Sequence, residues 1–368
     1  MKKTSKSLLL AAAVGLLATS CLKDEDPYRA GFSFPYINAG VYANTTADSL
    51  VFTALGPWKI TPETAGASWV QLQTLSGRGN TINRIGVTYD LNTTGTSRMA
   101  RFSIVDTDHP DDAHTSWHYL QTATRGDGSL GNAALVKTIK SSDGYEATID
   151  YDSHARPVNY VLKDANGVTK QLTINYNESE GVITVNNAGN IMRGEMDLGY
   201  QATDLIGDRD TVGYRSQYYS QYAVSPNMTY AFNFVSYRQD SYQLYGILLG
   251  GQSLAADSLH CADSLRYINR LRSGTDLCNE ALKLNYGSMD NRHQSVDVNQ
   301  LLLGFDECHP MLLLSMFRYV RSTSILTGAT STGRNISVAT ELNADKSVSR
   351  MTVSDALKGT EITYTFDY

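Results

Sequence analysis

Two clusters of histidine, cysteine and carboxylate residues have side chains that could bind a metal ion. The first is the segment DTDHPDDAHTSWH at residues 106–118. It fails the spacing of a calcium loop, because Pro110 and Asp111 stand where that loop needs an oxygen donor and a glycine. On a strand, His114 and His118 would share one side but lie about 13 Å apart, too far for one zinc ion. We therefore expect a solvated loop without a metal.

The second cluster consists of the dipeptides His260-Cys261 and Cys308-His309. They could form a zinc site if they met in space, but they lack the C-x-x-C spacing that marks many zinc sites. A disulfide or buried thiols is the simpler interpretation. Cys261 and Cys278 are the nearer pair in sequence for a disulfide. Three reduced, buried cysteines are the alternative, and we predict no metal site.

Catalytic motifs are absent from the sequence. It contains no G-x-S-x-G, no H-E-x-x-H and no glycine-rich phosphate loop. Carboxylates are numerous, but no spacing marks an acid–base pair of the kind that glycosidases use. We expect a protein that is not an enzyme and needs no cofactor.

The clearest chemical signal is at Cys21. Three lysines precede the apolar run Leu8 to Ala18, which is shorter than the ~20 residues that span a bilayer. The small residues Ala18-Thr19-Ser20 then lead directly to Cys21. This arrangement resembles the lipobox of bacterial lipoproteins, which implies removal of residues 1–20 and acylation of the Cys21 thiol. Ordinary secretion with an incidental cysteine is the alternative.

An acidic run follows Cys21. Its residues are Lys23, Asp24, Glu25 and Asp26. The run resembles the lipoprotein export signal of Bacteroidota, which implies lipid anchoring in the outer membrane with exposure on the cell surface. The periplasmic face is the alternative. The same run also fits a solvated tether over residues 21–30, since charged segments with few apolar residues do not pack.

Charge limits the partners of the mature chain. Removing residues 1–20 lowers the count of Lys and Arg from 31 to 28 against 37 Asp and Glu, so the net charge becomes −9. This acidic balance disfavours nucleic acid, because its phosphates would be repelled. We expect contact with the membrane through the lipid anchor alone, and a polysaccharide or another outer-membrane protein as partner.

The elements expected over residues 31–124 are about seven short strands separated by Gly, Asn, Asp and Pro, a pattern typical of a β-sandwich. Trp58, the segment SWVQLQTLSGRGN (68–80), VTYDLNTTGTSRMARFSI (87–104) and Gln121 occur in an order that resembles a BACON domain. That resemblance implies an Ig-like sandwich of Bacteroidota surface proteins, associated with carbohydrate or acting as a spacer. We expect Trp58 and Trp69 in its core.

A linker is expected at residues 125–133, which are rich in glycine and turn formers. Residues 134–368 then form a β-rich domain of unknown function. Its segment IDYDSHARPVNYVL resembles the hairpin of YD-type repeats, and INYNESEGVITV and TELNADKSVSRMTVS have the same shape. Hairpins at both ends predict one antiparallel sheet with an insertion. The layout resembles uncharacterised C-terminal lipoprotein domains found beside BACON modules.

The insertion is expected to be helical. In QSLAADSLHCADSLRYINRLRSG (252–274), apolar and small residues recur at spacings of three and four, and Gly274 marks a helix end. The apolar segment 297–320 is expected to be buried and broken at Pro310. The predicted fold class is therefore mainly β, an Ig-like β-sandwich followed by a larger antiparallel sheet domain with a helical insertion.

Tyrosines are concentrated between residues 214 and 245. An aromatic face can stack on the C–H patches of a sugar while the hydroxyl stays in water. Strand alternation allows only half of these side chains on one face, so the others belong to the core. The candidate ligand platform is Tyr214, Tyr218, Tyr222, Tyr230, Tyr237 and Tyr242.

The combined expectation is a surface-anchored lipoprotein that binds a glycan or another ligand on residues 134–368, with the sandwich as a spacer. A structural or accessory subunit of an outer-membrane complex is one alternative. A carbohydrate-active enzyme is the other.

Overall fold

The computed structural model describes most of the chain after residue 30. Its backbone is described for residues 31–36, 40–111, 113–187, 189–196, 202, 204–207, 211–213, 231–238, 241–249, 252–257, 265–272, 276–306, 308, 310–316 and 321–368. Side chains are described for the same residues except 35, 36, 190 and 204–281.

The chain divides into two compact units, and each unit is made of three separate segments of the sequence. Unit 1 contains residues 1–39, 47–89 and 99–119. Unit 2 contains residues 40–46, 90–98 and 120–368. Residues 40–46 and 90–98, which lie between segments of unit 1 in the sequence, therefore belong by their contacts to unit 2.

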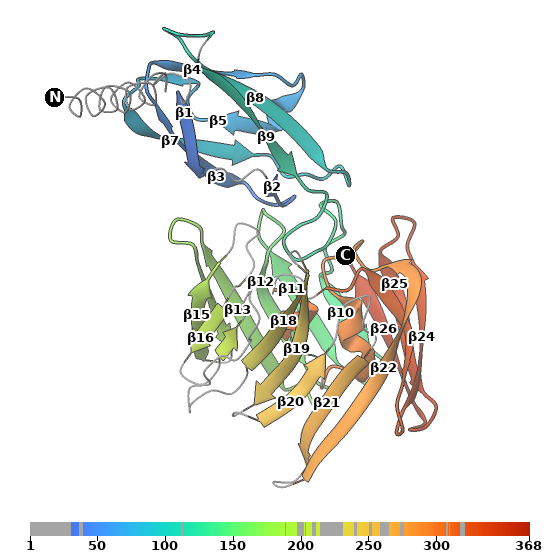
Figure 1. The fold of residues 1–368 in the computed structure, drawn as a ribbon. Helices are drawn as coiled ribbons and strands as arrows, with labels where there is room; N and C mark the ends of the chain where they lie inside the picture. Colours follow the sequence, from blue (N-terminus) through green and yellow to red (C-terminus); the bar gives the residue numbers. More distant parts are fainter. Residues whose placement is uncertain are drawn as a thin grey trace, which may run out of the picture. The chain divides into compact units, whose positions relative to one another are not determined.

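The N-terminal strands form two sheets, with the orders β1-β3-β7-β5 and β2-β9-β8-β4-β6 (Figure 1). The short helix η1 (Ala67–Trp69) leads into β5. The strands are β1 (Phe32–Tyr36), β2 (Gly40–Val41), β3 (Ala47–Ala54), β4 (Trp58–Pro62), β5 (Val70–Leu72), β6 (Ser76–Gly77), β7 (Thr81–Tyr89), β8 (Arg98–Asp106) and β9 (His114–Gln121).

Aromatic rings fill the space between these two sheets. The ring of Phe52 on β3 meets Trp58 on β4 at a centroid distance of 5.0 Å, and Tyr89 on β7 meets Tyr119 on β9 at 5.8 Å. Trp58 and Trp69 are 2% and 7% exposed, so the prediction that both are core residues is confirmed.

Unit 2 is built around one long antiparallel series of strands in chain order, and its last strand pairs back with its first. Its first half is β10 (Thr138–Ser141), β11 (Glu146–Tyr151), β12 (Pro157–Lys163), β13 (Thr169–Asn177), β14 (Val182–Asn187), β15 (Asn190–Glu195), β16 (Asp204–Gly207) and β17 (Thr211–Gly213). Its second half is β18 (Ala231–Arg238), β19 (Ser241–Leu249), β20 (Gln252–Asp257), β21 (Leu265–Arg272), β22 (Asp276–Asp290), β23 (Ser324–Thr330), β24 (Asn335–Leu342), β25 (Val348–Asp355) and β26 (Thr360–Asp367). The mainly β fold class with a larger antiparallel sheet is confirmed.

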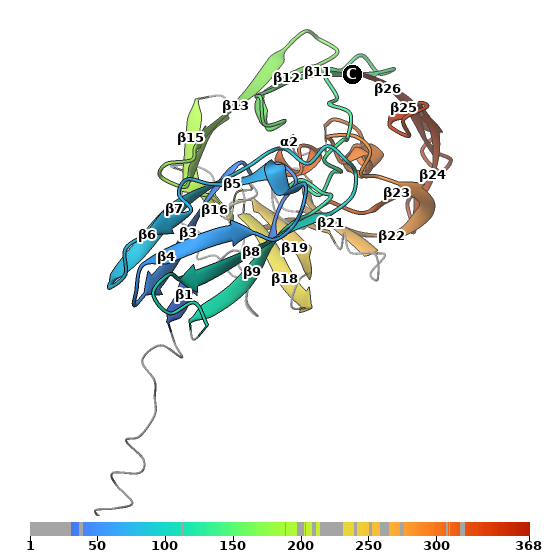
Figure 2. The same cartoon turned by 90° about the horizontal axis from the view of Figure 1, so that it is seen from above.

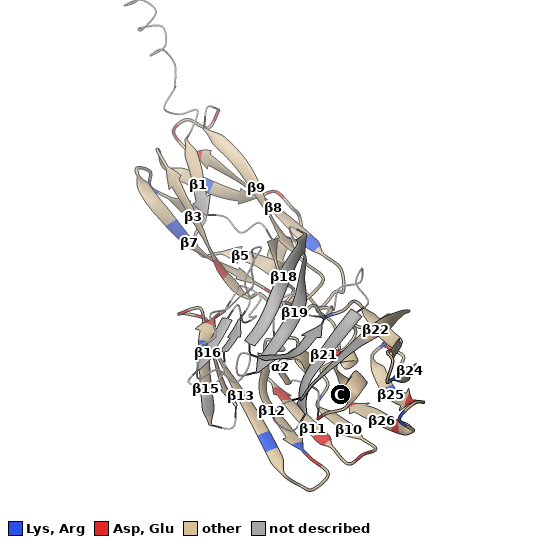
Figure 3. Ribbon diagram, turned by 60° about the horizontal axis from the view of Figure 1, so that its bottom comes forward, with Lys and Arg blue, Asp and Glu red and all other residues tan. Residues whose placement is uncertain are grey.

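Strand alternation gives the sheet of unit 2 an apolar inner face and a polar outer face. On β11, for example, Ala147 and Ile149 are buried while Thr148 and Asp150 are exposed. The buried members of neighbouring strands form one hydrophobic core with the segment between β22 and β23. Along the strands of this unit that Figure 3 draws in colour, Lys, Arg, Asp and Glu are few among the other residues.

That segment, residues 291–316, is called the inner segment here. It contains η2 (Val298–Leu303) and α2 (Pro310–Leu313), and residues 294–302 and 311–316 are all buried. Viewed from above, α2 lies inside the curve of the strands (Figure 2). The predicted burial is confirmed for residues 297–302 and 311–316, whereas Asp306 is exposed. Pro310 begins a helix here, a position that needs no backbone N–H.

The predicted helix over residues 252–274 is wrong. The described backbone forms β20 and β21 instead, and β21 pairs with β22 from Leu265↔Lys283 to Arg272↔Asp276. A run of apolar residues at spacings of three and four fits either element when it is short, and pairing with neighbouring strands decided the outcome. The helical residues that the structure describes in unit 2 lie in the inner segment.

The predicted hairpins are confirmed as β11–β12, β13–β14 and β24–β25. Four turns between consecutive strands share one five-residue form, which residues 125–129 also adopt: 141–145, 152–156, 164–168 and 343–347. In each, the first N–H donates to the fifth carbonyl, and the fourth N–H donates to the first carbonyl. The fourth residue has a positive φ, and these residues are Gly144, Ala155, Gly167 and Lys346. This is the three-residue hairpin loop with a left-handed residue.

Candidate functional site

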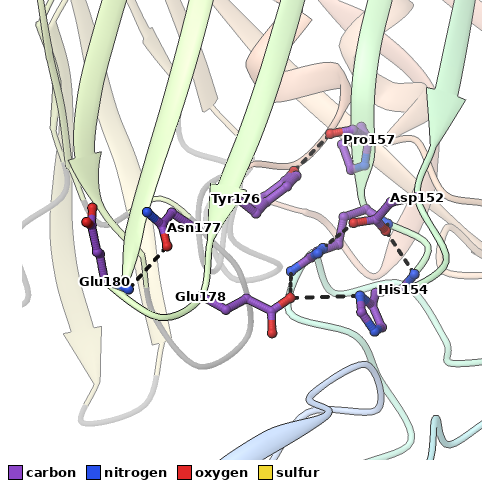
Figure 4. A network of polar contacts seen from close by, with 8 residues as sticks. Asp152, His154, Pro157, Tyr176, Asn177, Glu178 and Glu180 are labelled. Carbon is purple, nitrogen blue, oxygen red and sulfur yellow. Dashed lines mark hydrogen bonds and ion pairs between the residues drawn. The ribbon is translucent and has the colours of Figure 1, made fainter.

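The densest group of charged side chains in the described part of unit 2 lies at the ends of two hairpins (Figure 4). In the β11–β12 turn, one carboxylate oxygen of Asp152 accepts the backbone N–H groups of His154 and Arg156 at 2.9 and 3.0 Å. The guanidinium of Arg156 donates to the other oxygen of Asp152 at 2.6 Å and to Glu178, beyond β13, at 2.9 Å. Arg156 thus joins the two turns.

Tyr176, on β13, packs its ring against Arg156 in the same group. Its ring lies 4.5 Å from the guanidinium carbon of Arg156, and its hydroxyl donates to the carbonyl of Pro157 at 3.0 Å. Burial is the main cause that raises the pKa of Tyr176 above its ordinary value. The Nδ1 atom of His154 lies 3.9 Å from Glu178, beyond hydrogen-bond range. An imidazole beside a carboxylate could move a proton, but both carboxylates already bind Arg156, so the group serves to fasten the hairpins.

A second polar group holds the loops of unit 2 near residue 121. The side-chain N–H groups of Gln121 point to the carbonyls of Tyr42, Ala43 and Asp90 at 3.3, 3.3 and 3.0 Å. Its carbonyl accepts from Arg98 at 2.8 Å. Gln121 is fully buried, so one amide ties together three loops that are distant in sequence.

Asn92 ties the same loops. Its amide donates to the carbonyls of Thr96 and Thr122 at 2.8 and 2.9 Å, and its carbonyl accepts the N–H and hydroxyl of Thr94. A Cβ atom at Gly131 would lie 1.8 Å from the Asn92 carbonyl oxygen, so only glycine fits there. Arg98 and Gln121, which both belong to the BACON-like pattern, are hydrogen-bonded to each other in this group.

Two arginines hold residues 122–135 in place, Arg125 by bonds within this stretch and Arg321 by bonds to it and to the inner segment. Arg125 is 6% exposed and donates to the carbonyls of Gly131 and Ala133 at 3.1 and 2.9 Å, while its Nη1 atom has no hydrogen-bond partner among the described residues. Burial lowers the pKa of Arg125, Asp127 raises it, and the guanidinium of Arg321 lowers it again.

Arg321 binds four backbone carbonyls. They belong to Asp127, Asn291, Gln294 and Ser295, at 3.1, 2.8, 2.8 and 2.7 Å. One guanidinium therefore holds the predicted linker against the inner segment.

Asp297 is the most deeply buried carboxylate of unit 2 that the structure describes. Its side chain accepts from Asn291 at 2.6 Å, from the N–H of Asn299 at 3.2 Å and from Gln300 at 3.2 Å. It thereby caps the start of η2. Burial raises the pKa of Asp297, against the lowering effects of Arg321 and of these hydrogen bonds.

An exposed pair lies beside the start of β11. The hydroxyl of Tyr145 donates to Asp306 at 2.7 Å, and this bond is the main cause that raises the pKa of Tyr145 to about 12. Its ring stacks on the buried Phe305 at 5.9 Å. The pair could hydrogen-bond a polar ligand, but a tyrosine and one carboxylate do not define a reaction.

Several predicted site residues lie outside the described residues. These are Cys21, Lys23, Asp24, Glu25, Asp26, Tyr214, Tyr218, Tyr222, Tyr230 and Cys261. Tyr237 and Tyr242 lie on β18 and β19, and Cys278 lies on β22, but their side chains are not described. The proposed Cys261–Cys278 disulfide and the tyrosine platform stay predictions. Cys308 is half-buried in the inner segment.

The described residues of the first predicted cluster are spread over a turn and a strand. Asp106 is buried and accepts the N–H groups of Asp108 and His109. His114 and His118 are both exposed on β9. Within the described ranges, no group of three or more His, Cys, Asp or Glu is arranged to hold a metal ion. In the same part of the chain, no helix is both long and apolar enough to cross a bilayer.

The residues that sequence reasoning missed are Arg125, Arg156 and Arg321. Arg321 and the bond of Arg156 to Glu178 depend on groups that only the fold brings together, whereas Arg125 and the bond of Arg156 to Asp152 are local and carry no recognised motif. The repeated turns could have been found, because Asp152 and Asp164 both stand three residues before a left-handed position.

No family model matches the chain, and no curated protein matches it. Among solved structures, it is similar to a porin-like protein from Bacteroides uniformis at 13% identity, with a TM-score of 0.42 over 64% of this chain and 98% of that one. A porin-like protein from Bacteroides vulgatus is similar at 9% identity, with a TM-score of 0.31 over 64% and 98%. A GH5 xyloglucanase from Bacteroides ovatus is similar at 11% identity, with a TM-score of 0.21 over 34% and 30%. At these TM-scores the likenesses establish neither a shared fold nor a shared function.

Proposed function

We propose that this chain is a lipoprotein of the bacterial outer membrane, anchored through Cys21, that binds a carbohydrate on unit 2 without acting on it chemically. The observation that carries the proposal is the outer face of the sheet of unit 2. That face combines a rigid apolar support with a surface of short polar side chains, and the tyrosine-rich strands belong to the same sheet.

The polar face is ordered by hydrogen bonds between neighbouring strands. Asn159 on β12 donates to Asp150 on β11 at 2.9 Å and accepts from Gln171 on β13 at 2.9 Å. The bonds lie on the exposed side of the three strands. Carboxylate and amide groups offer both acceptors and donors, which are what the hydroxyl groups of a sugar require.

The aromatic part comes from β18 and β19, which pair antiparallel with Ser236 opposite Tyr242. Two of the six predicted platform residues, Tyr237 and Tyr242, thus lie on adjacent strands of this sheet. In carbohydrate sites an aromatic ring covers the C–H patch of a sugar and polar groups bind its hydroxyls. In this sheet β14 to β17 lie between the tyrosines and the hydrogen-bonded polar residues of β11 to β13, so we expect the two to contact different sugar units of one polysaccharide.

Affinity electrophoresis of residues 22–368 in gels that contain single polysaccharides tests the proposal. We expect at least one polysaccharide to retard the chain, and the Tyr237→Ala, Tyr242→Ala and Asn159→Ala variants to lose that retardation. Leu357→Ala is the control, because it removes an exposed side chain from the β25–β26 turn. A folded chain that no polysaccharide retards would refute carbohydrate binding. Copurification of a stoichiometric outer-membrane protein would then support the accessory-subunit alternative.

A further inference from the structure

The chain enters unit 1 at one end of its four-stranded sheet. Residue Phe32 on β1 pairs with Ala54, the last residue of β3, and the carbonyl of Gly31 accepts the N–H of Leu55 at 3.2 Å. The covalent path from Cys21 therefore arrives directly beside Leu55.

Two large apolar side chains are exposed at this same end. Leu55 is 41% exposed and Ile82, on β7, is 72% exposed. Thr53 pairs with Ile82, and the buried Phe52 and Ala54 alternate with Thr53 and Leu55 along the chain. Leu55 and Ile82 thus share the outer face of the sheet, within two residues of each other across the strand pair.

We propose that this end of unit 1 rests on the lipid surface, with Leu55 and Ile82 in contact with the headgroup–acyl boundary. The proposal rests on the acylation of Cys21 in the proposed function. The outer face would then contact lipid at one end only, because the next outward residues on β7 are Arg84, Gly86 and Thr88.

The length of chain between Cys21 and Gly31 supports contact of this end with the lipid surface. Ten residues reach at most about 35 Å when fully extended. A tether of this length holds the end of unit 1 at an effective concentration on the order of millimolar near the membrane. Two apolar side chains are therefore enough to keep this end of unit 1 in contact with the membrane for part of the time. The same two side chains would not hold a chain that lacks an anchor on a membrane.

The charges near this end are nearly balanced among the described residues, where Arg84, the next outward residue after Ile82, adds one positive charge to the two pairs named below. Lys59 and Arg78 are exposed, and so are Asp108 and Asp111 in the turn after β8. The N–H of Thr107 donates to the carbonyl of Pro57 at 2.8 Å, which brings that acidic turn beside the end of β3. Attraction to anionic lipid is therefore not expected, and contact should occur on neutral phosphatidylcholine.

Hydrogen–deuterium exchange tests the contact. Residues 22–368 would carry an N-terminal hexahistidine tag and be held on phosphatidylcholine vesicles that contain a nickel-chelating lipid. If the end is bound half of the time or more, the amides of residues 55, 56 and 78–82 should exchange at least about twofold more slowly than in the free chain. Ile82→Ser should remove this protection. Thr88→Ser, an exposed position about 20 Å further along β7, should leave it unchanged.

Equal exchange in the anchored and free chains would overturn the proposed contact. The artificial anchor makes this outcome independent of the native modification. An unmodified Cys21 in the native protein would instead refute the lipid anchor, and with it the biological basis of the contact, even if the tagged chain showed protection.

Discussion

Gln121 is a single residue on which three loops of unit 2 depend. Replacing it with leucine keeps the volume but leaves the carbonyls of Tyr42, Ala43 and Asp90 without this donor. Each of these carbonyls keeps another donor, from Thr45, Asn92 and Arg98 respectively, whereas the Nε atom of Arg98 loses its acceptor. A buried group left unsatisfied costs about 1–3 kcal/mol, so we expect the free energy of unfolding to fall by about 1–3 kcal/mol. Urea unfolding measures it. Gln71→Leu, exposed on β5, is the control and should change stability by less than about 0.5 kcal/mol. Equal effects of the two changes would contradict the role given to Gln121.

Asp297 should make stability depend on pH. Because burial raises its folded-state pKa above 3.8, the folded chain binds more protons than the unfolded chain between these two pKa values. The free energy of unfolding should therefore fall as the pH rises through that interval, by about 1.4 kcal/mol per unit of pKa difference. Asp297→Asn cannot titrate. Urea unfolding measured in steps from about pH 4 to 8 should show that the wild-type chain loses stability relative to this variant as the pH rises. If the free energies of unfolding of the two chains change with pH in parallel, the pKa of Asp297 is not raised.

At the scale of elements, the repeated hairpin turn makes a paired prediction. Ala155 and Gly167 occupy the same position, with φ of 60° and 82°. A left-handed conformation is costly for residues with a Cβ, so Ala155→Gly should stabilise the chain by up to about 1 kcal/mol and Gly167→Ala should destabilise it by about 1 kcal/mol. Thermal unfolding measures both. Changes of the same sign would show that the two turns are not equivalent.

The hairpins could be predicted from the sequence because each turn is formed by a few consecutive residues. In the folded chain, the buried Ile149 on β11 and Met351 on β25 alternate with exposed or half-buried neighbours, as a strand with one face in the core requires. The sequence did not allow β20 and β21 to be predicted, since the same residues fit a helix until the pairing with β22 is known. The roles of Asp297 in the inner segment and of Arg321 beyond it were also not predicted, because both residues find their partners only in the folded chain.

At the scale of the whole molecule, the predicted linker is part of unit 2. Arg321 binds the carbonyl of Asp127, the N–H of Leu130 donates to Arg292, and the N–H of Gly126 donates to Asn44. A fragment of residues 134–368 lacks these partners. We expect it to unfold about 5–10 °C below residues 31–368.

A fragment that begins at residue 120 is the matched comparison, because it restores the bonds to Asp127 and Leu130 but not the one to Asn44. Its melting temperature should lie between the other two. Identical melting of the unit 2 transition in all three chains would show that residues 120–133 do not stabilise unit 2.

The acyl anchor at Cys21 is the central claim, since both the proposed placement in the envelope and the contact of unit 1 with lipid depend on it. Intact-mass spectrometry of the protein purified from its native membranes tests it directly. The account predicts a chain of residues 21–368 whose mass exceeds that of the polypeptide by covalently bound acyl groups at the amino terminus. A native chain that still carries residues 1–20, or that lacks any acyl group on Cys21, would contradict it.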